Sequence, residues 1–268
     1  MVGMCGRYAV TTDPAQLAQS IDATYEGPAG PEAGPDYNVA PTDTVAAVVS
    51  RHSNPDSAAP RAPTRRVRLM RWGLLSPWVK ARPDGAPESG GPLLINARAD
   101  KVASSPAFRG AARDKRCLVP MDGWYEWRVD ADVAWSGNKA SSRAGGKVAK
   151  TPCFMHRDNG EPMFMAGLWS VWKPSRDVAP LLSCTIITTD AVGELARVHD
   201  RMPLILAERD WDAWLNPDAP LDPALLARVP DVHHIEIREV SNRVNSVRNN
   251  GPELIAPAEP RTEQMTLL

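Results

Sequence analysis

The sequence contains few cysteines, and their spacing argues against sites that need paired cysteines. Four occur in 268 residues: Cys5, Cys117, Cys153 and Cys184. No two of them form a Cys-x-x-Cys pair, the spacing typical of zinc sites, and a reducing cytosol disfavours disulfides. The last three lie in apolar stretches, where free cysteine packs well, so we expect them in the core. We therefore expect no metal and no other cofactor.

Long apolar runs are also missing. The longest falls far short of the roughly 20 residues that cross a bilayer. The first residues lack the apolar segment of a signal peptide. We therefore expect a cytoplasmic protein that does not enter a membrane.

Net charge is almost absent, at −1 over the whole chain, which by itself argues against a nucleic-acid partner. The distribution of charge along the chain does not argue against such a partner. Between Arg61 and Arg116 there are thirteen Lys and Arg residues against four Asp and Glu, a net charge of +9. Such a basic segment fits phosphate binding. The alternative is a solvated surface whose countercharges lie elsewhere in the fold.

Short β-type runs dominate the periodic parts of the chain. We expect strands at Thr44–Ser50, Arg66–Trp72, Pro92–Asn96, Arg116–Pro120, Gly123–Arg128, Pro162–Trp169, Ser183–Thr189 and His234–Val240. Helices are expected at Asp13–Ile21, Ala99–Phe108, Ala207–Leu215 and Pro223–Arg228. Strands and helices do not alternate strictly, which argues against a doubly wound parallel sheet.

Loops rich in Pro, Gly, Ala or Ser separate these elements, at Glu26–Asp36, Ser53–Thr64, Ala81–Pro92 and Val129–Thr151. No repeat and no long linker divides the chain. We expect an α+β fold: a single compact domain with a strongly bent, barrel-like, mostly antiparallel sheet and a few flanking helices.

Cys5 follows Met4 directly. If Met4 is the initiator or residues 1–4 are removed, the protein begins with a cysteine that carries an amine and a thiol on adjacent carbons. Such an aminothiol can form an imine with an aldehyde and close to a five-membered thiazolidine. An α-amine, with a reference pKa of about 7.7–8.0, is partly unprotonated at neutral pH. The alternative is a small residue packed in the first strand.

Three polar residues stand in settings that fit a reaction site. Glu126 lies among aromatics in Gly-Trp-Tyr-Glu-Trp, where loss of water raises a carboxyl pKa and suits it to move protons. Strand alternation places it on the face of Trp124. Asn96 ends an apolar run, and His199 lies in a charged segment that ends in proline. A salt bridge, a helix cap and a structural histidine are the respective alternatives.

Aromatic residues also occur within the basic segment. Trp72 and Trp78 lie among its arginines, a combination that suits unpaired bases because each base can stack on an aromatic ring. Core packing is the alternative for some of the nine tryptophans.

Seven motifs occur in a fixed order along the chain: Cys5–Tyr8, Tyr37–Pro41, Arg71–Leu74, Ile95–Arg98, Gly123–Trp127, His199–Pro203, and Val244-Asn245 before Gly251–Leu254. In this order they resemble the SRAP family, the SOS response-associated peptidase-like or abasic-site processing proteins. The resemblance extends over residues 4–256, which we expect to form one abasic-site processing domain, with a flexible tail at 257–268.

The resemblance implies a β-rich α+β fold with a positively charged groove for single-stranded DNA. It implies that a monomer acts on damaged DNA, at the nucleoid. In the family the initiator methionine is removed and the exposed cysteine forms a thiazolidine with the aldehyde of an abasic site. By motif match, Cys5 is that nucleophile, with Asn96, Glu126 and His199 around it. The positions that match DNA contacts are Arg7, Pro41, Trp78, Arg98, Trp127 and Thr188.

Two features depart from the family pattern. Three residues precede the expected start at Met4, and residues 129–151 form an insertion beside the glutamate motif. Two other functions stay open. One is a cysteine peptidase or amidase with Cys5 as thiolate, His199 as base and Asn96 or Glu126 as the orienting group, of which self-removal of residues 1–4 would be a limited version. The other is a non-catalytic binder of single-stranded DNA.

Overall fold

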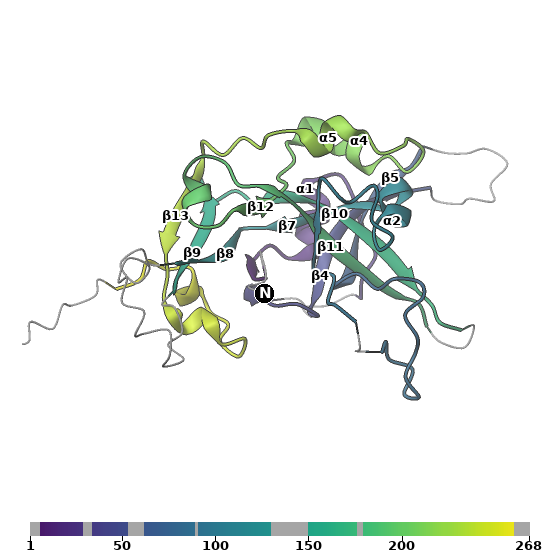
Figure 1. Cartoon of the computed structure of the whole chain (residues 1–268), viewed down its shortest axis with the longest axis horizontal. Coiled ribbons are helices and arrows are strands. Elements are labelled where there is room, and N and C mark those ends of the chain that lie inside the picture. Colours follow the sequence, from purple (N-terminus) through teal and green to yellow (C-terminus); the bar gives the residue numbers. More distant parts are fainter. Residues whose placement is uncertain are drawn as a thin grey trace, which may run out of the picture.

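The computed structural model describes residues 6–28, 34–52, 62–88, 91–129, 150–175 and 179–259. Cys5, residues 260–268 of the expected tail and most of the loops expected at 53–64 and 129–151 lie outside these ranges. Strands dominate the described part, and the helices are few and short (Figure 1).

The larger of two sheets closes on itself. Its strands follow the order β12 (Arg201–Pro203), β11 (Leu181–Asp190), β10 (Met163–Trp172), β7 (Arg116–Met121), β4 (Thr44–Arg51), β5 (Thr64–Trp72) and β2 (Thr24–Tyr25). A short strand, β6 (Asn96–Arg98), also pairs with β11. Because β5 pairs with β4 on one side and with β11 on the other, the strands from β11 to β5 form a closed ring. The predicted barrel-like, mostly antiparallel sheet is confirmed.

A second, five-stranded sheet packs against this ring. Its order is β13 (Ile235–Glu239), β9 (Lys150–Arg157), β8 (Gly123–Val129), β1 (Tyr8–Val10) and β3 (Asp36–Val39). All of its pairings are antiparallel. The N-terminal strand β1 is therefore an internal strand, hydrogen-bonded on both sides.

The period of two along each strand explains the main core. In β7, Cys117 and Val119 enter the cluster that joins the two sheets, whereas Leu118 enters a second cluster under the helices. Both faces of β7 are therefore buried. Cys153 and Cys184 lie in the same intersheet cluster as Cys117, and the expectation of three core cysteines is confirmed.

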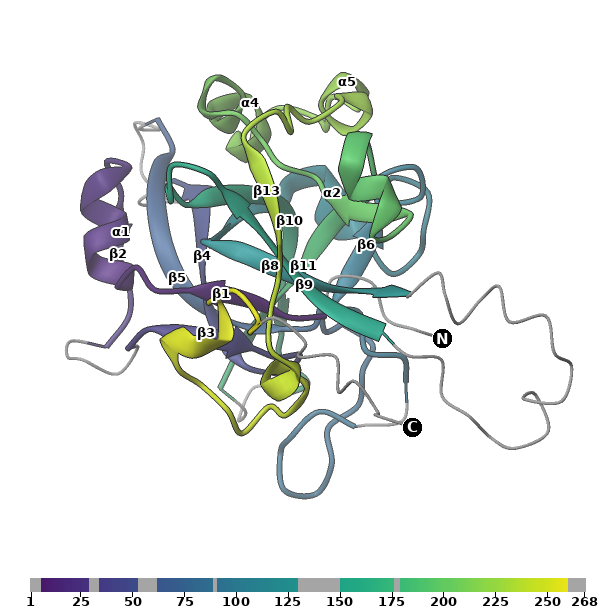
Figure 2. The same ribbon diagram turned by 90° about the vertical axis from the view of Figure 1, so that its left-hand side faces the viewer.

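The helices cover the second cluster. They are α1 (Pro14–Ser20), α2 (Arg109–Asp114), α4 (Trp211–Leu215) and α5 (Pro223–Ala227). Figure 2 shows α1 beside β5, with α4 and α5 together at the top. Short 3-10 segments are η2 (Gly193–Arg197), η3 (Glu208–Asp210), η4 (Asn242–Asn245) and η5 (Pro252–Leu254). No helix in the described ranges has the length and apolar character to cross a bilayer.

Local chemistry explains one correct and one wrong helix prediction. Asp13 caps α1 by accepting hydrogen bonds from the amides of Ala15 and Gln16, and Pro14 occupies its first turn. The helix expected at Ala99–Phe108 is wrong: this segment forms successive turns, and α2 begins only at Arg109. Pro106 lacks the amide that a helix interior needs, which explains the break.

Candidate nucleic-acid interface

The first described residues lie beside the glutamate motif. Tyr8 pairs with Trp124 in β8, and the amide of Tyr125 donates to the carbonyl of Arg7 at 3.0 Å. Cys5 lies outside the described residues. The chain that leads to it is nevertheless held against β8, one residue from Glu126.

Glu126 is a buried carboxylate, with 2% of its surface exposed. The clusters of its neighbours agree with the predicted alternation: Trp124 packs in the intersheet core, whereas Tyr125 and Trp127 pack on the opposite face. Glu126 therefore continues the face of Trp124 at the border of the intersheet core. Trp127 is half-buried, and its indole Nε1 donates to Asn245 Oδ1 at 2.7 Å.

Arg7 belongs to a network that the sequence did not reveal. Its guanidinium donates to Asn38 Oδ1 at 2.7 Å and to the carbonyl of Val244 at 2.9 Å. Burial lowers the pKa of Arg7, an effect that Asp43 partly opposes. The Asn38 amide in turn donates to the carbonyls of Ser246 (2.9 Å) and Asn249 (2.8 Å), which lie in the segment that follows η4.

Asn38 lies within the Tyr37–Pro41 motif, and this was the one signal that could have identified it. Its side chain is 3% exposed. The buried amide of Asn38 in β3 bonds to Arg7, just before β1, and to a loop more than 200 residues away. These hydrogen bonds hold the Arg7 side chain in place.

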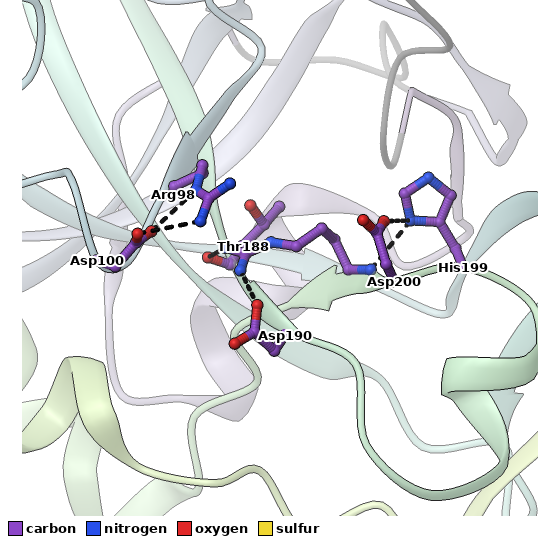
Figure 3. Close-up of polar contacts among 7 residues, drawn as sticks. Arg98, Asp100, Thr188, Asp190, His199 and Asp200 are labelled. Carbon is purple, nitrogen blue, oxygen red and sulfur yellow. Dashed lines mark hydrogen bonds and ion pairs between the residues drawn. The ribbon is translucent and has the colours of Figure 1, made fainter.

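A second group of predicted residues lies on β6 and β11. The parallel register places Asn96 beside Ile186 and Arg98 beside Thr188, and the Ala99 amide donates to the Thr188 carbonyl at 2.8 Å. Thr188 is fully buried, and its Oγ1 has no hydrogen-bond partner among the described residues. Arg98 is exposed and makes a two-point ion pair with Asp100, at 2.9 and 3.0 Å (Figure 3). This hydrogen-bonded pair raises the pKa of Arg98 and lowers that of Asp100.

His199 is held at one ring nitrogen. Nδ1 accepts a hydrogen bond from the Arg201 amide at 3.0 Å and lies 2.9 Å from Asp200 Oδ1. One nitrogen cannot accept from the amide and donate to the carboxylate at once. Since the Asp200 side chain is 87% exposed and hydrated, the backbone bond decides the neutral tautomer. The proton then resides on Nε2, which points away from this group (Figure 3).

Arg201, which lies in the His199–Pro203 motif, pairs with Asp190, a charged residue outside all seven motifs. Arg201 is 6% exposed; its guanidinium pairs with Asp190 and donates to the Thr188 carbonyl at 2.6 Å. Because β12 pairs with the end of β11, this one residue connects the Thr188 backbone to the His199 ring. Only the pairing of the two strands makes this connection visible.

Pro41 and Trp78 lie at loops that leave the closed ring. Pro41 precedes a tight turn in which Thr42 has a φ of 84° and its amide donates to the Trp72 carbonyl at 2.8 Å. Trp78 is 64% exposed on the loop after β5.

The structure therefore groups Asn96, Arg98, Thr188 and His199 around β11, whereas Arg7, Glu126 and Trp127 lie on the five-stranded sheet. Glu126, on the face of Trp124, borders the intersheet core, which also contains Ile186 and Val198, whereas Trp127 packs on the opposite face of its sheet.

The described residues contain no group of His, Cys, Asp and Glu that could hold a metal ion.

Solved structures share this fold. A protein from Bacteroides thetaiotaomicron aligns with a TM-score of 0.71 at 21% sequence identity, covering 95% of this chain and 100% of that chain. At this identity the likeness concerns the fold alone.

Sequence relatives are closer. Abasic site processing protein YoqW of Bacillus subtilis (strain 168) is 33% identical over 256 residues, 94% of this chain and 99% of that protein. Abasic site processing protein HMCES of Gallus gallus is 30% identical over 284 residues, 96% of this chain and 78% of that protein. The family model for SOS response associated peptidase (SRAP) matches residues 4–247. The chain belongs to the SRAP family.

Proposed function

We propose that this protein captures abasic sites in single-stranded DNA through a covalent crosslink to Cys5. The relatives' name, abasic site processing protein, supports the substrate class. The observation that carries the proposal is that β1 is paired on both sides and holds Arg7 against Tyr125, next to Glu126. A reaction of an N-terminal amine needs the N-terminus held at the reaction site, and this pairing supplies that anchor.

The crosslink forms in two steps once residues 1–4 have been removed. The free α-amine of Cys5 attacks the aldehyde carbon C1′ of the ring-opened sugar, and loss of one water leaves an imine. The Cys5 sulfur then attacks the same carbon. A C–S bond forms, the imine π electrons move to nitrogen, and the thiol proton ends on that nitrogen. The product is a thiazolidine, and the net release is one water.

Glu126, His199 and Asn96 have separate roles in this scheme. Glu126 takes a proton from the Cys5 amine or thiol and returns it on reversal. His199, in its imidazolium form, protonates the sugar oxygen through Nε2–H when the furanose ring opens. Asn96 orients the sugar or the amine by hydrogen bonding. The imine intermediate also permits strand scission, which is an associated lyase activity. The protein itself removes residues 1–4.

The DNA contacts divide by chemistry. Arg7 and Arg98 bind phosphates, Trp78 and Trp127 stack on unpaired bases, and Pro41 and Thr188 shape the groove. The protein acts as a monomer in the cytoplasm, on damaged DNA. Residues 4–256 form the working domain, and the expected boundary at 257 is too early, because Pro257 pairs with Val240 and the Ala258 amide donates to the Glu239 carbonyl at 2.8 Å.

The tautomer of His199 weighs against a general cysteine peptidase. A thiol-activating base needs a free lone pair on the nitrogen that faces the thiol. With Nδ1 occupied by the Arg201 amide, neutral His199 offers a donor at Nε2 instead. The acid role in sugar opening requires the imidazolium form of the same ring.

Denaturing electrophoresis tests the proposal. Purified protein mixed with single-stranded DNA that contains one abasic site should give a covalent adduct that resists denaturation. The same strand with a tetrahydrofuran site, which has no aldehyde, should give none. Cys5→Ala should lose the stable adduct but retain an imine that borohydride traps. Cys5→Ala with a wild-type adduct would refute the mechanism, and so would a fully active protein whose intact mass still includes Met4.

A further inference from the structure

Trp78 is held in an exposed position by the loop that carries it. Leu74 pairs with Leu94 at the base of this loop. The Leu75 amide donates to Ser183 Oγ at 2.9 Å, and the Trp172 indole donates to the Val79 carbonyl at 2.8 Å. Three anchors therefore hold the loop, one of them on β10 and one on β11, and Trp78 on this loop is 64% exposed.

A cavity of about 300 Å³ lies beside Trp78, between this loop, α2 and β10. Its walls are mostly apolar, with Leu74, Ala107 and Val171 among them, and Gly110 leaves one side open. Arg113 and Lys115 lie at its edge. Asp114 pairs with both cations, at 3.6 Å and 3.0 Å, so one positive charge remains unbalanced in this trio.

We propose that this cavity is a nucleobase subsite for the single strand, in which one unpaired base stacks on Trp78 and the adjoining phosphate lies against Arg113 and Lys115. An apolar slot beside a rigid aromatic ring fits the flat face of a base, and cations at its edge complement the backbone. Few polar groups line the slot, so we expect stacking with little base preference. The inference rests on the proposed function, because it places a second nucleotide of the same substrate.

The position of the cavity relative to β11 supports this placement. Ser183, which anchors the Trp78 loop, and Thr188, which lies beside Arg98, are on the same strand. Five residues of strand separate them, about 17 Å at the usual rise. The loop also returns through Leu94 to Asn96, two residues later. A short segment of single-stranded DNA can therefore extend from the residues around β11 to the cavity beside Trp78.

Fluorescent base scanning tests the inference. Single strands with a tetrahydrofuran site carry 2-aminopurine at one position at a time on either side of it. We expect quenching at one position in the wild-type protein and its loss in both Trp78→Ala and the cavity-filling Gly110→Leu. Affinity should fall about 5- to 150-fold in Trp78→Ala, the range of one lost base stack. Val229→Ala, which changes an equally exposed apolar side chain after α5, should match wild type.

The crosslink is measured separately on an abasic strand. If Trp78→Ala and Gly110→Leu bind and quench like wild type while the adduct still forms, the subsite and the stacking role of Trp78 are refuted, and the capture of abasic sites by Cys5 stands. Absence of the wild-type adduct with position-specific quenching intact would refute the proposed chemistry instead. Quenching at every position alike would also overturn a defined subsite.

Discussion

The five-stranded sheet and the group around β11 contribute to the interface in opposite ways. On the sheet, Glu126 is 2% exposed and Arg7 is held by the buried amide of Asn38. Around β11, Arg98 is exposed in its ion pair with Asp100, and the Asp190 carboxylate is exposed in its ion pair with Arg201. Charges removed from water are strongly sensitive to their neighbours, whereas exposed pairs contribute little and rearrange easily.

This difference assigns different tasks to the two regions. The buried side suits proton transfer, which needs a carboxylate in a fixed and dry position. The exposed side suits a polyanion, because a phosphate can replace a carboxylate partner of Arg98 at low cost. We therefore expect changes at the buried residues Glu126 and Asn38 to alter the reaction rate or the stability, and changes at the exposed Arg98 to alter the affinity for DNA.

Glu126→Gln provides the strongest test of the buried side. The amide keeps the shape of the carboxylate but cannot take a proton, so we expect the single-turnover crosslinking rate to fall about 10²- to 10⁴-fold. Affinity for undamaged single strands should stay within about twofold. A wild-type crosslinking rate in both this variant and His199→Ala would remove the two residues from the mechanism.

Asn38→Ala tests whether the sheet holds Arg7 in place. The change removes the Oδ1 acceptor of Arg7 and leaves the carbonyls of Ser246 and Asn249 without their donor. We expect the free energy of unfolding to fall by about 2–3 kcal/mol, measured by urea denaturation. Asn245→Ala, which loses the exposed bonds to Trp127 and Asn242, is the matched control and should cost under about 1 kcal/mol. Equal losses in the two variants would contradict a special role for Asn38.

Arg98→Ala tests the exposed side. If Arg98 makes one phosphate contact, the slope of log affinity against log salt should fall by about 0.7 for a single strand. The loss should be similar across base sequences, and protein stability should hardly change because the Arg98–Asp100 pair is exposed. A loss that depends on base identity would point to base readout instead.

Asp100→Asn should have the smallest effect, in the opposite direction. Without its carboxylate partner, Arg98 is released for phosphate, so we expect affinity for single strands to rise about two- to fivefold at low salt. The gain should shrink at high salt and vanish in the background of Arg98→Ala. A gain that persists without Arg98 would show that Asp100 acts only through general repulsion of DNA.

Much of the fold was predictable because local patterns and burial agree. Most predicted strands, including Thr44–Ser50 and Gly123–Arg128, appear with similar bounds in β4 and β8. Strand predictions were wrong where the local apolar pattern and the pairing with a partner strand differ. The apolar run Pro92–Asn96 was expected to be a strand, but pairing with β11 begins only at Asn96. There the partner strand, rather than the local sequence, selects the residues that pair.

The site was predictable only in its residue types. The motifs identified Glu126, His199, Asn96 and Arg98 as polar residues in unusual settings, but gave no sign that Glu126 is buried on the five-stranded sheet and Arg98 exposed beside β11. Asn38 and Arg201 lie in two of the motifs, but their contacts could not be predicted because their partners lie elsewhere in the chain. Asn38 contacts the segment at 244–249, and Arg201 reaches back to Asp190 and Thr188.

By itself the sequence determined the family, the β-rich class of fold and the ordered set of motifs, since these depend on residue identity and on periods of a few residues. The tertiary structure decided which nitrogen of His199 carries the proton, how far Glu126 is removed from water and where Trp78 is held. Each of these depends on groups that meet only when β12 pairs with β11, when the two sheets pack together, or when the loop after β5 is anchored on β10 and β11. Proton position, desolvation and exposure are properties of such contacts, and residues far apart in the chain acquire them only on folding.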